Sequence, residues 1–224
     1  MKNYVCLRLE GPMQAWGCHT NWDHKPTYKM PTRSAIVGLM SCALGYLRED
    51  PKILQLEKNI LSFTVREDRA GHISSDFQTI EGKPLLNTLH VARSGGNRLT
   101  STREYIYDAS YLVFVEFKDN EIRNKVVSAL KSPKWNLFLG RKCCVPSKPV
   151  YEGICHAEDI FEALMLYNVE DYKATERKFE TDDVVAKTMN CFIRCSKLDK
   201  IGSVNLRTFN KRYVYCGKIN CMAK

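Results

Sequence analysis

The stretch YVCLRLE, at residues 4–10, decides the fold. Its apolar residues Val5, Leu7 and Leu9 alternate with less apolar neighbours, which is the period-two pattern of a half-buried β-strand. A polar, aromatic loop is expected to follow at 11–30. The segment 34–48 is then apolar on almost every side, so it predicts a helix that must be buried.

The signals at the start of this helix agree with it. Pro31 and Thr32 precede it in the way that helix starts prefer. Gly38 and Gly45 are unfavourable inside a helix, so they predict that another backbone packs closely against it.

Two more strands and a second helix follow along the chain. Alternating apolar residues predict strands over 61–66 and 111–117. Ile122, Val126 and Leu130 recur at helical spacing behind Asp119-Asn120, and Pro133 ends that helix. With a last strand around 149–155, the order is that of the ferredoxin-like split βαβ fold, which RNA-recognition modules share with many proteins that bind no RNA. The predicted class is therefore α+β, with a ferredoxin-like (RRM/RAMP) domain at 1–155.

Two regions lie outside this order. The segment 68–102 is long and polar and contains Gly95-Gly96, so we expect it to project as a hairpin or arm. Beyond the first domain the pattern predicts a short helix at 159–167, an acidic linker to Asp183, and strands around 191–194 and 212–215. We interpret 156–224 as a smaller, β-rich C-terminal region.

The chain carries an excess of positive charge. It has 34 Lys and Arg against 25 Asp and Glu in 224 residues, a formal net charge of +9, and such proteins attract phosphate-bearing partners. The charge is also segregated, because 118–148 holds eight basic and two acidic residues, 152–183 three and ten, and 184–224 nine and one. This pattern favours an RNA groove beside an acidic surface, with solvated helix faces as the alternative.

The rest of the sequence bears on the location of the protein and on metal binding. Neither a signal-peptide core nor a run of about 18 apolar residues is visible, so we expect a cytoplasmic protein with no membrane contact. Ten cysteines are expected to be thiols there, and the pairs Cys191/Cys195 and Cys216/Cys221 lack the spacing of a zinc knuckle. We expect no structural metal and no other cofactor.

Three segments could carry RNA-binding chemistry. In GPMQAWG, at 11–17, Gln14 and Trp16 are expected on an exposed rim, where an amide and a ring can bind and stack an unpaired base. The alternative is that Trp16 packs at the edge of the core. In LGRK, at 139–142, Gly140 lets the backbone approach a ligand, and Arg141 and Lys142 supply two cations.

The third segment is PTRSAIVG, at 31–38. Arg33 lies in the first helical turn, where its charge opposes the helix dipole and costs a few tenths of a kcal/mol. A helix N-terminus offers free N–H groups to anions, so Thr32, Arg33 and Ser34 form a candidate phosphate site. The alternative is that Arg33 reaches back to a surface carboxylate.

These motifs, together with REYxxDAS at 103–110, occur in an order that resembles the CasD family, the RAMP-type subunits of the type I-E CRISPR Cascade complex. The resemblance covers about the first 155 residues well and the rest loosely. It implies a non-catalytic subunit that holds the 5′ handle of the crRNA and contacts the Cascade backbone and large subunits, with target DNA reached only through the assembled complex.

The resemblance also implies which residues do this. The segment at about 76–102 would be a thumb, with Lys83, Arg93 and Arg98 on it. The handle contacts would come from polar, aromatic and basic residues of the four motifs: Gln14, Trp16, Thr32, Arg33, Ser34, Arg103, Arg141 and Lys142. Cys143 and Cys144 depart from the family pattern and place a thiol near the RNA.

A rival interpretation is an enzyme. Type I-C relatives cut precursor crRNA without a metal, which requires a base and a cation that His, Tyr and Lys can supply. The candidates here are His19, His24, Tyr28, Lys29 and His90. A metal-dependent nuclease or deaminase is disfavoured because no His-x-x-x-His, His-x-Glu or paired carboxylates occur in a suitable context.

Overall fold

The computed structural model describes residues 1–18, 23–81, 98–167, 176–183, 185–186, 193–203 and 208–221. Its centre is a seven-stranded sheet in which neighbouring strands are antiparallel. The strands, in their order across the sheet, are β10 (Tyr151–Ala157), β1 (Lys2–Glu10), β9 (Ser110–Phe117), β6 (Ile60–Arg69), β11 (Glu176–Thr181), β13 (Thr208–Asn220) and β12 (Ile193–Ser203).

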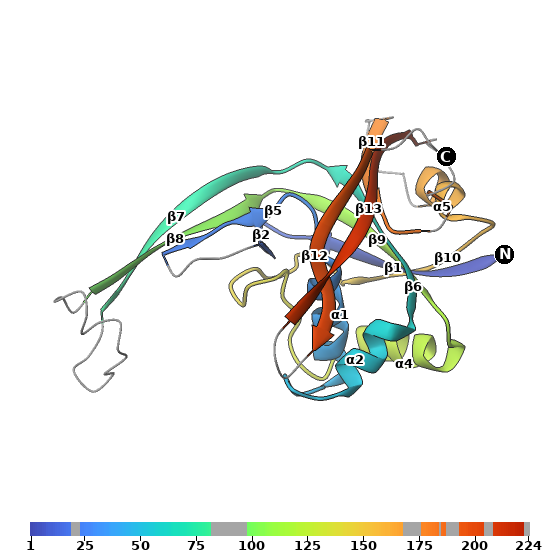
Figure 1. Ribbon diagram of the computed structural model, residues 1–224, viewed down its shortest axis with the longest axis horizontal. Helices are drawn as coiled ribbons and strands as arrows, with labels where there is room; N and C mark the ends of the chain where they lie inside the picture. Colours follow the sequence, from blue (N-terminus) through green and yellow to red (C-terminus); the bar gives the residue numbers. More distant parts are fainter. Residues whose placement is uncertain are drawn as a thin grey trace.

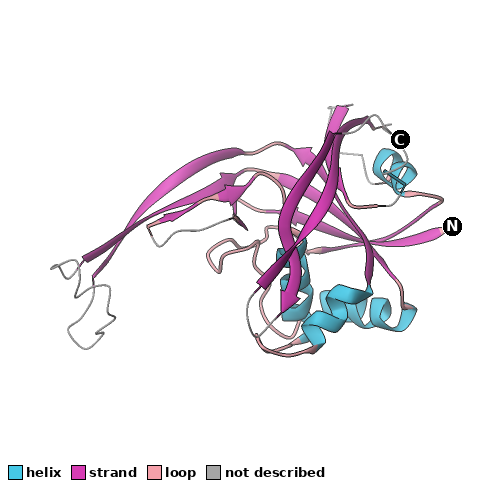
Figure 2. Cartoon of the chain, viewed as in Figure 1, coloured by secondary structure: helices cyan, strands magenta, loops and turns pink. Residues whose placement is uncertain are grey.

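Helices lie on both sides of this sheet (Figure 1). On one side are α1 (Arg33–Leu44), α2 (Lys52–Asn59) and α4 (Asn120–Lys131), and on the other is α5 (Ile160–Leu166). Two capping carboxylates help to start α4 and α5: Asp119 accepts from the Glu121 N–H at 2.8 Å, and Asp159 accepts from the N–H groups of Phe161 and Glu162 at 2.9 Å. The mixture of helices and strands in the predicted α+β class is confirmed, and Figure 2 shows how they are distributed.

The first strand is buried on both faces, so the prediction of a half-buried strand is wrong. Val5, Leu7 and Leu9 pack into the larger core with α1, α2 and α4. Tyr4 and Cys6 enter a second core with α5 and β11. The sequence could not reveal this second layer, because α5 and β11 lie far along the chain from the first strand.

The buried helix α1 has the predicted start but ends earlier than expected. Gly45 follows Leu44 in the left-handed conformation, with φ of 75°, and its N–H bonds the Cys42 carbonyl, as a glycine after a helix commonly does. The expected close packing of a backbone against Gly38 is wrong, since nothing lies within 4 Å of the position that a Cβ would occupy there.

A long hairpin leaves the body of the protein (Figure 1). Strands β7 (His72–Glu81) and β8 (Arg98–Tyr107) pair antiparallel over their whole length, from His72↔Tyr107 to Glu81↔Arg98. The expected projecting arm is therefore present as far as these strands, and the glycine pair at 95–96 lies outside the described residues.

The C-terminal strands extend the central sheet. β11 pairs with β6 where an acidic linker was expected, and β12 and β13 are much longer than the two short strands of the prediction. The division into 1–155 and 156–224 stays a prediction. None of the described helices is long and apolar enough to cross a membrane, and the cytoplasmic location likewise stays a prediction.

One glycine is fixed by a contact between two loops. Gly140 has φ of 95°, and a Cβ on it would lie 1.7 Å from the Ala15 carbonyl oxygen. The neighbouring Leu139 carbonyl accepts from the Ala15 N–H at 3.1 Å. The close approach that Gly140 permits is therefore to the protein's own chain, and the interpretation that it serves a ligand is wrong.

Two glycine substitutions should have opposite effects on stability. Gly140→Ala should lower the free energy of unfolding by more than the ~1–2 kcal/mol that a left-handed conformation alone costs an L-residue, because the carbonyl must also move. Gly38→Ala, in the open middle of α1, should raise it by ~0.5–1 kcal/mol. Urea unfolding of both variants measures this, and equal effects would contradict the described loop contact.

Candidate nucleic-acid interface

Arg33 is an internal residue. Only 4% of it is exposed. Its Nε donates to Glu57 Oε1 at 2.8 Å and its Nη1 to Asp182 Oδ2 at 2.9 Å, while Nη2 donates to the carbonyls of Glu57 and Ile60. Arg33 does pair with carboxylates, as the alternative interpretation predicted, but Glu57 and Asp182 are largely buried, so the expected surface carboxylate is wrong.

The start of α1 already has an anionic partner. Asp199 of β12 accepts from the Arg33 backbone N–H at 3.0 Å, and Arg212 of β13 holds the same carboxylate through two hydrogen bonds of 2.9 and 2.6 Å. Thr32 is buried and Ser34 half-buried. The predicted phosphate site at residues 32–34 is therefore wrong, because a carboxylate of the protein occupies the helix N-terminus.

Burial and the nearby positive charges have opposite effects on the pKa values of these carboxylates. Burial alone would raise the pKa of Asp199, but the hydrogen bonds and charge of Arg212 hold it below its usual value. For Glu57 burial prevails and raises the pKa, although Arg33 acts in the opposite direction. We refer to Arg33, Glu57, Asp182, Asp199 and Arg212 as the Arg33 network.

Gln14 and Trp16 are internal as well. Gln14 donates from Nε2 to the carbonyls of Leu9 and Ala109, at 3.1 and 2.9 Å. Trp16 has no exposed surface and belongs to the larger core. The expected exposed rim is wrong, and neither side chain can reach a base while the protein holds this conformation.

The network gives a direct prediction for Arg33→Ala. Removing one partner leaves Glu57 buried without its cation, which typically costs ~3–5 kcal/mol. Chemical or thermal unfolding should show a loss of that size, whereas Arg48→Ala, at an exposed position just after α1, should change stability by less than about 0.5 kcal/mol. A stable Arg33→Ala variant would contradict the network.

A basic face lies instead at the base of the β7–β8 hairpin. The short strand β4 (His24–Lys25) runs parallel to β8, with Lys25 opposite Arg103. Strand alternation puts Arg103 and Tyr105 on the same face of β8. The two cations are thus neighbours across a pair of strands, and on its other side Arg103 is opposite Asp76 of β7.

Arg141 joins this face from the loop after α4. It donates from Nη1 to the Glu104 carbonyl and from Nη2 to the Lys25 carbonyl, both at 2.9 Å, and its guanidinium lies 4.6 Å from the centre of the Tyr105 ring. Lys142, next to it, is exposed. We refer to Lys25, Arg103, Tyr105, Arg141 and Lys142 as the hairpin-base face.

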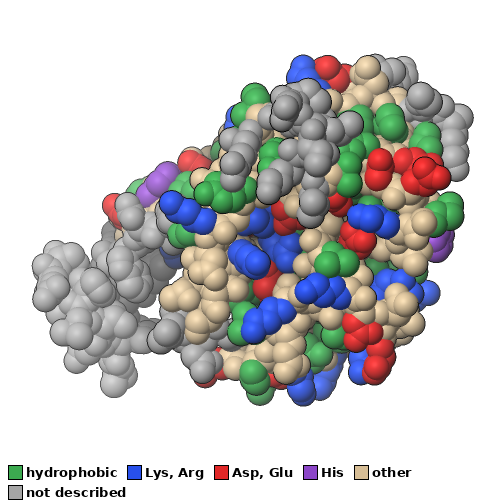
Figure 3. Space-filling model, turned by 45° about the vertical axis from the view of Figure 1, so that its right-hand side comes forward, with side chains coloured by type: hydrophobic (Ala, Val, Ile, Leu, Met, Phe, Trp, Pro, Cys, Tyr) green, Lys and Arg blue, Asp and Glu red, His purple; other side chains and the backbone are tan. Residues whose placement is uncertain are grey.

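The structure therefore unites three of the eight predicted contact residues, Arg103, Arg141 and Lys142. It adds Lys25, which the sequence could not indicate, because its place depends on the pairing of a two-residue strand with a distant one. Arg141 also ties the loop to the two strands through its carbonyl contacts. On the face shown in Figure 3, Lys and Arg side chains extend across the middle with some acidic groups among them.

Cys143 and Cys144, the two cysteines that depart from the family pattern, lie beside this face. Cys143 is exposed, with its Sγ 3.7 Å from the Tyr105 hydroxyl, and Cys144 is buried. Burial raises the pKa of the Cys144 thiol to about 11. The nearby Cys143 is the thiol that could meet a bound ligand.

Among the candidate catalytic groups, His24 does not share the hairpin-base face, and Lys29 is exposed. His24 pairs with Thr102, on the opposite face of the strands from Arg103, and its Nε2 lies 3.6 Å from Glu104 Oε1. Tyr28 lies under Lys197, whose Nζ is 5.1 Å from the ring centre. His19, His90, Lys83 and Arg93 lie outside the described residues, as does the side chain of Arg98.

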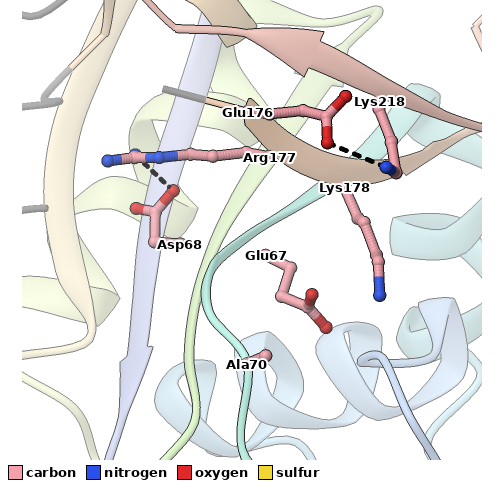
Figure 4. A pocket seen from close by; sticks show the side chains of 7 residues that line it. All are labelled: Glu67, Asp68, Ala70, Glu176, Arg177, Lys178 and Lys218. Carbon is pink, nitrogen blue, oxygen red and sulfur yellow. Dashed lines mark hydrogen bonds and ion pairs between the residues drawn. The ribbon is translucent and has the colours of Figure 1, made fainter. Parts of the chain in front are cut away.

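A cavity of about 260 Å³ lies elsewhere, beside β6, β11 and β13 (Figure 4). Its charged lining is balanced, with three acidic and three basic side chains: Glu67, Asp68, Glu176, Arg177, Lys178 and Lys218. The figure shows Arg177 paired with Asp68 and Lys218 with Glu176. Such a lining has no excess positive charge to attract phosphates.

Comparison with known proteins identifies the family. The model of the family described as CRISPR-associated protein (Cas_Cas5) matches residues 4–190. The chain belongs to this Cas5 family. The "CRISPR system Cascade subunit CasD" of Escherichia coli (strain K12) is 32% identical to this Cas5-family chain over 177 residues, which is 75% of the chain and 78% of CasD.

Solved structures agree with this assignment. A chain of a "CRISPR RNA-guided surveillance complex" is 25% identical, with a TM-score of 0.74, over 97% of the Cas5-family chain and 90% of its own length. A second, described as "Crystal structure of Cas protein", is 26% identical, with a TM-score of 0.72, over 97% and 95%. The resemblance drawn from the sequence motifs is confirmed at the level of the family.

Proposed function

We propose that this Cas5-family chain is a non-catalytic subunit of a type I-E Cascade complex, in which it holds the 5′ handle of the crRNA at the hairpin-base face. Within the complex it contacts the backbone and large subunits, and it meets target DNA only through the assembly. The observation that carries the proposal is the position of Arg141 in a member of this family: it lies over the Tyr105 ring and bonds the main chain at Lys25 and Glu104. Arg103 is paired with Lys25 across the strands, and the exposed Lys142 follows Arg141 in the sequence.

The chemistry of this face suits RNA. Cations that line a groove neutralise phosphates and release counterions. The exposed Lys142 and the half-buried Lys25 and Arg103 can do this, whereas Arg141 uses two donors on main-chain carbonyls and mainly positions the loop. The name of the E. coli relative, a Cascade subunit, supports the proposed assembly.

Two architectural proposals accompany this one. The order β1–α1–β6–β9–α4–β10, with β10-β1-β9-β6 as the order within the sheet, supports a ferredoxin-like description of the first part of the chain. The β7–β8 hairpin supports the proposal of a thumb, since it carries its distant end away from the sheet while its base adjoins the cations.

The absence of cleavage is also a proposal. His24 faces away from Arg103 and is paired with Glu104, and Lys197, which lies over the Tyr28 ring, is paired with Glu180. These pairings support the proposal, because they engage the cations and carboxylates nearest to the two candidate bases within the protein. Cleavage at a 2′-hydroxyl needs both groups around one phosphate.

Handle binding should depend on the accessible cations. Lys142→Ala and Arg103→Ala should each weaken binding of a short handle RNA by roughly 10-fold or more, and should each reduce the slope of log affinity against log salt by ~0.7 for every phosphate that is no longer neutralised. Lys125→Ala, on the exposed side of α4, is the matched control. Filter binding over a salt series measures both quantities.

Equal affinity and equal salt slopes for the three variants would overturn the proposed interface. Thermal unfolding of the same samples excludes a general loss of structure as the cause.

Incubation with repeat RNA tests the catalytic alternative. The wild-type protein should leave the RNA intact with and without a metal chelator, because His24 is paired with Glu104 and the Lys197 beside Tyr28 is paired with Glu180. Site-specific cutting that disappears in His24→Ala would make the endoribonuclease interpretation correct.

A further inference from the structure

The ribbon formed by β12 and β13 has an outer face with exposed aromatic rings. Strand alternation places Phe209, Lys211 and Tyr213 on the side of β13 opposite to the buried Arg212. Phe209 is 44% exposed and Tyr213 53%. Leu198, directly across from Lys211 on β12, is 38% exposed.

The orientation of this face is fixed from inside. Arg212 and Asp199 bond each other and reach the start of α1 on the inner side of the ribbon. This network thus lies behind Lys211 and Tyr213, whereas Phe209 is paired with Ile201, which is partly buried against the larger core. In the view of Figure 1 the two strands cross in front of other strands of the sheet.

The charge of the ribbon indicates the nature of its partner. No exposed residue in the described parts of β12 and β13 is acidic, whereas Lys200 and Lys211 are exposed, as is Lys218, which is paired with Glu176 of β11. Between 193 and 221 the sequence has one acidic residue, Asp199, against seven basic ones: Arg194, Lys197, Lys200, Arg207, Lys211, Arg212 and Lys218.

We propose that this outer face binds unpaired nucleotides of a single-stranded nucleic acid, which stack on Phe209 and Tyr213 while Lys211 contacts the phosphate between them. Flat rings on an exposed strand, with a cation between them, are the elements of a sequence-tolerant stacking platform. Four residues of extended strand separate the two rings by about 13 Å, so they meet two different bases.

This site is separate from the hairpin-base face and needs none of its residues. A protein partner that covers Phe209, Tyr213 and Leu198 is the competing occupant. Lysines are depleted in the cores of protein interfaces, whereas a polyanion is favoured by Lys211 at the centre of this face.

The test uses the full chain and two fluorescent probes of about 12 nucleotides, oligo(U) and oligo(dT), a length within the usual site size of such platforms. Phe209→Leu and Tyr213→Leu keep an apolar side chain but remove the flat ring. The double exchange Phe209→Tyr with Tyr213→Phe keeps both rings and is the matched control. Fluorescence anisotropy gives the affinities, and circular dichroism checks that each variant is folded.

Each leucine variant should bind at least about fivefold more weakly, and the exchanged pair should bind like the wild type. Weaker binding of both probes, or of only one, supports the platform and identifies whether RNA, DNA or both can occupy it. A 4-thiouridine oligonucleotide should also crosslink to a peptide that contains residues 208–213.

Unchanged affinities for both probes, or crosslinks only outside 208–213, would overturn the proposal. If the leucine variants bind both probes normally but fail to associate with another Cascade subunit, the face is a protein interface. Weak binding by Lys142→Ala together with normal binding by the leucine variants would overturn this site and leave the hairpin-base face intact.

Discussion

The structure depends on the Arg33 network. Its members come from the start of α1, the end of α2, the loop after β11, and strands β12 and β13, so one set of ion pairs joins segments from residue 33 to residue 212. Each carboxylate in it would be costly to bury alone, and each guanidinium has more donors than one carboxylate can use. The ribbon, the two nearest helices and the edge of the sheet can therefore adopt only positions in which all these groups meet.

A second cluster of buried ion pairs shows that part of the chain's positive charge lies in the interior. Asp68 accepts from Arg8, Arg66 and Arg177, all of them buried. Burial alone would raise the pKa of Asp68, but its hydrogen bonds with Arg66 and the nearby charges hold it low. Several arginines of this basic chain thus serve the interior, and the charge available to a nucleic acid is carried mainly by lysines and by the hairpin-base face.

The sequence predicts the local elements well and the exposure of single residues poorly. Periodicity locates β1, β9, α4 and α5, because each has a regular apolar pattern or a start signal such as Asp119. It misses that β1 is covered on both faces, since the second layer comes from distant residues.

The same limit applies to the candidate site. Arg33 and Trp16 lie in motifs that favour RNA contacts, but in the structure both are buried: Arg33 forms ion pairs with Glu57 and Asp182, and Trp16 packs in the larger core. Arg103, Arg141 and Lys142 do come together, but Lys25 beside them follows from strand pairing that no local pattern encodes.

The central claim is that RNA meets the chain at the hairpin base and not at the start of α1. Acylation footprinting of lysines, read by mass spectrometry with and without the handle RNA, tests it on the unmodified protein. The account predicts that Lys25 and Lys142 become protected, whereas Lys58, exposed on α2 next to the Arg33 network, keeps its reactivity. Protection of Lys58 with Lys25 and Lys142 unchanged would contradict it.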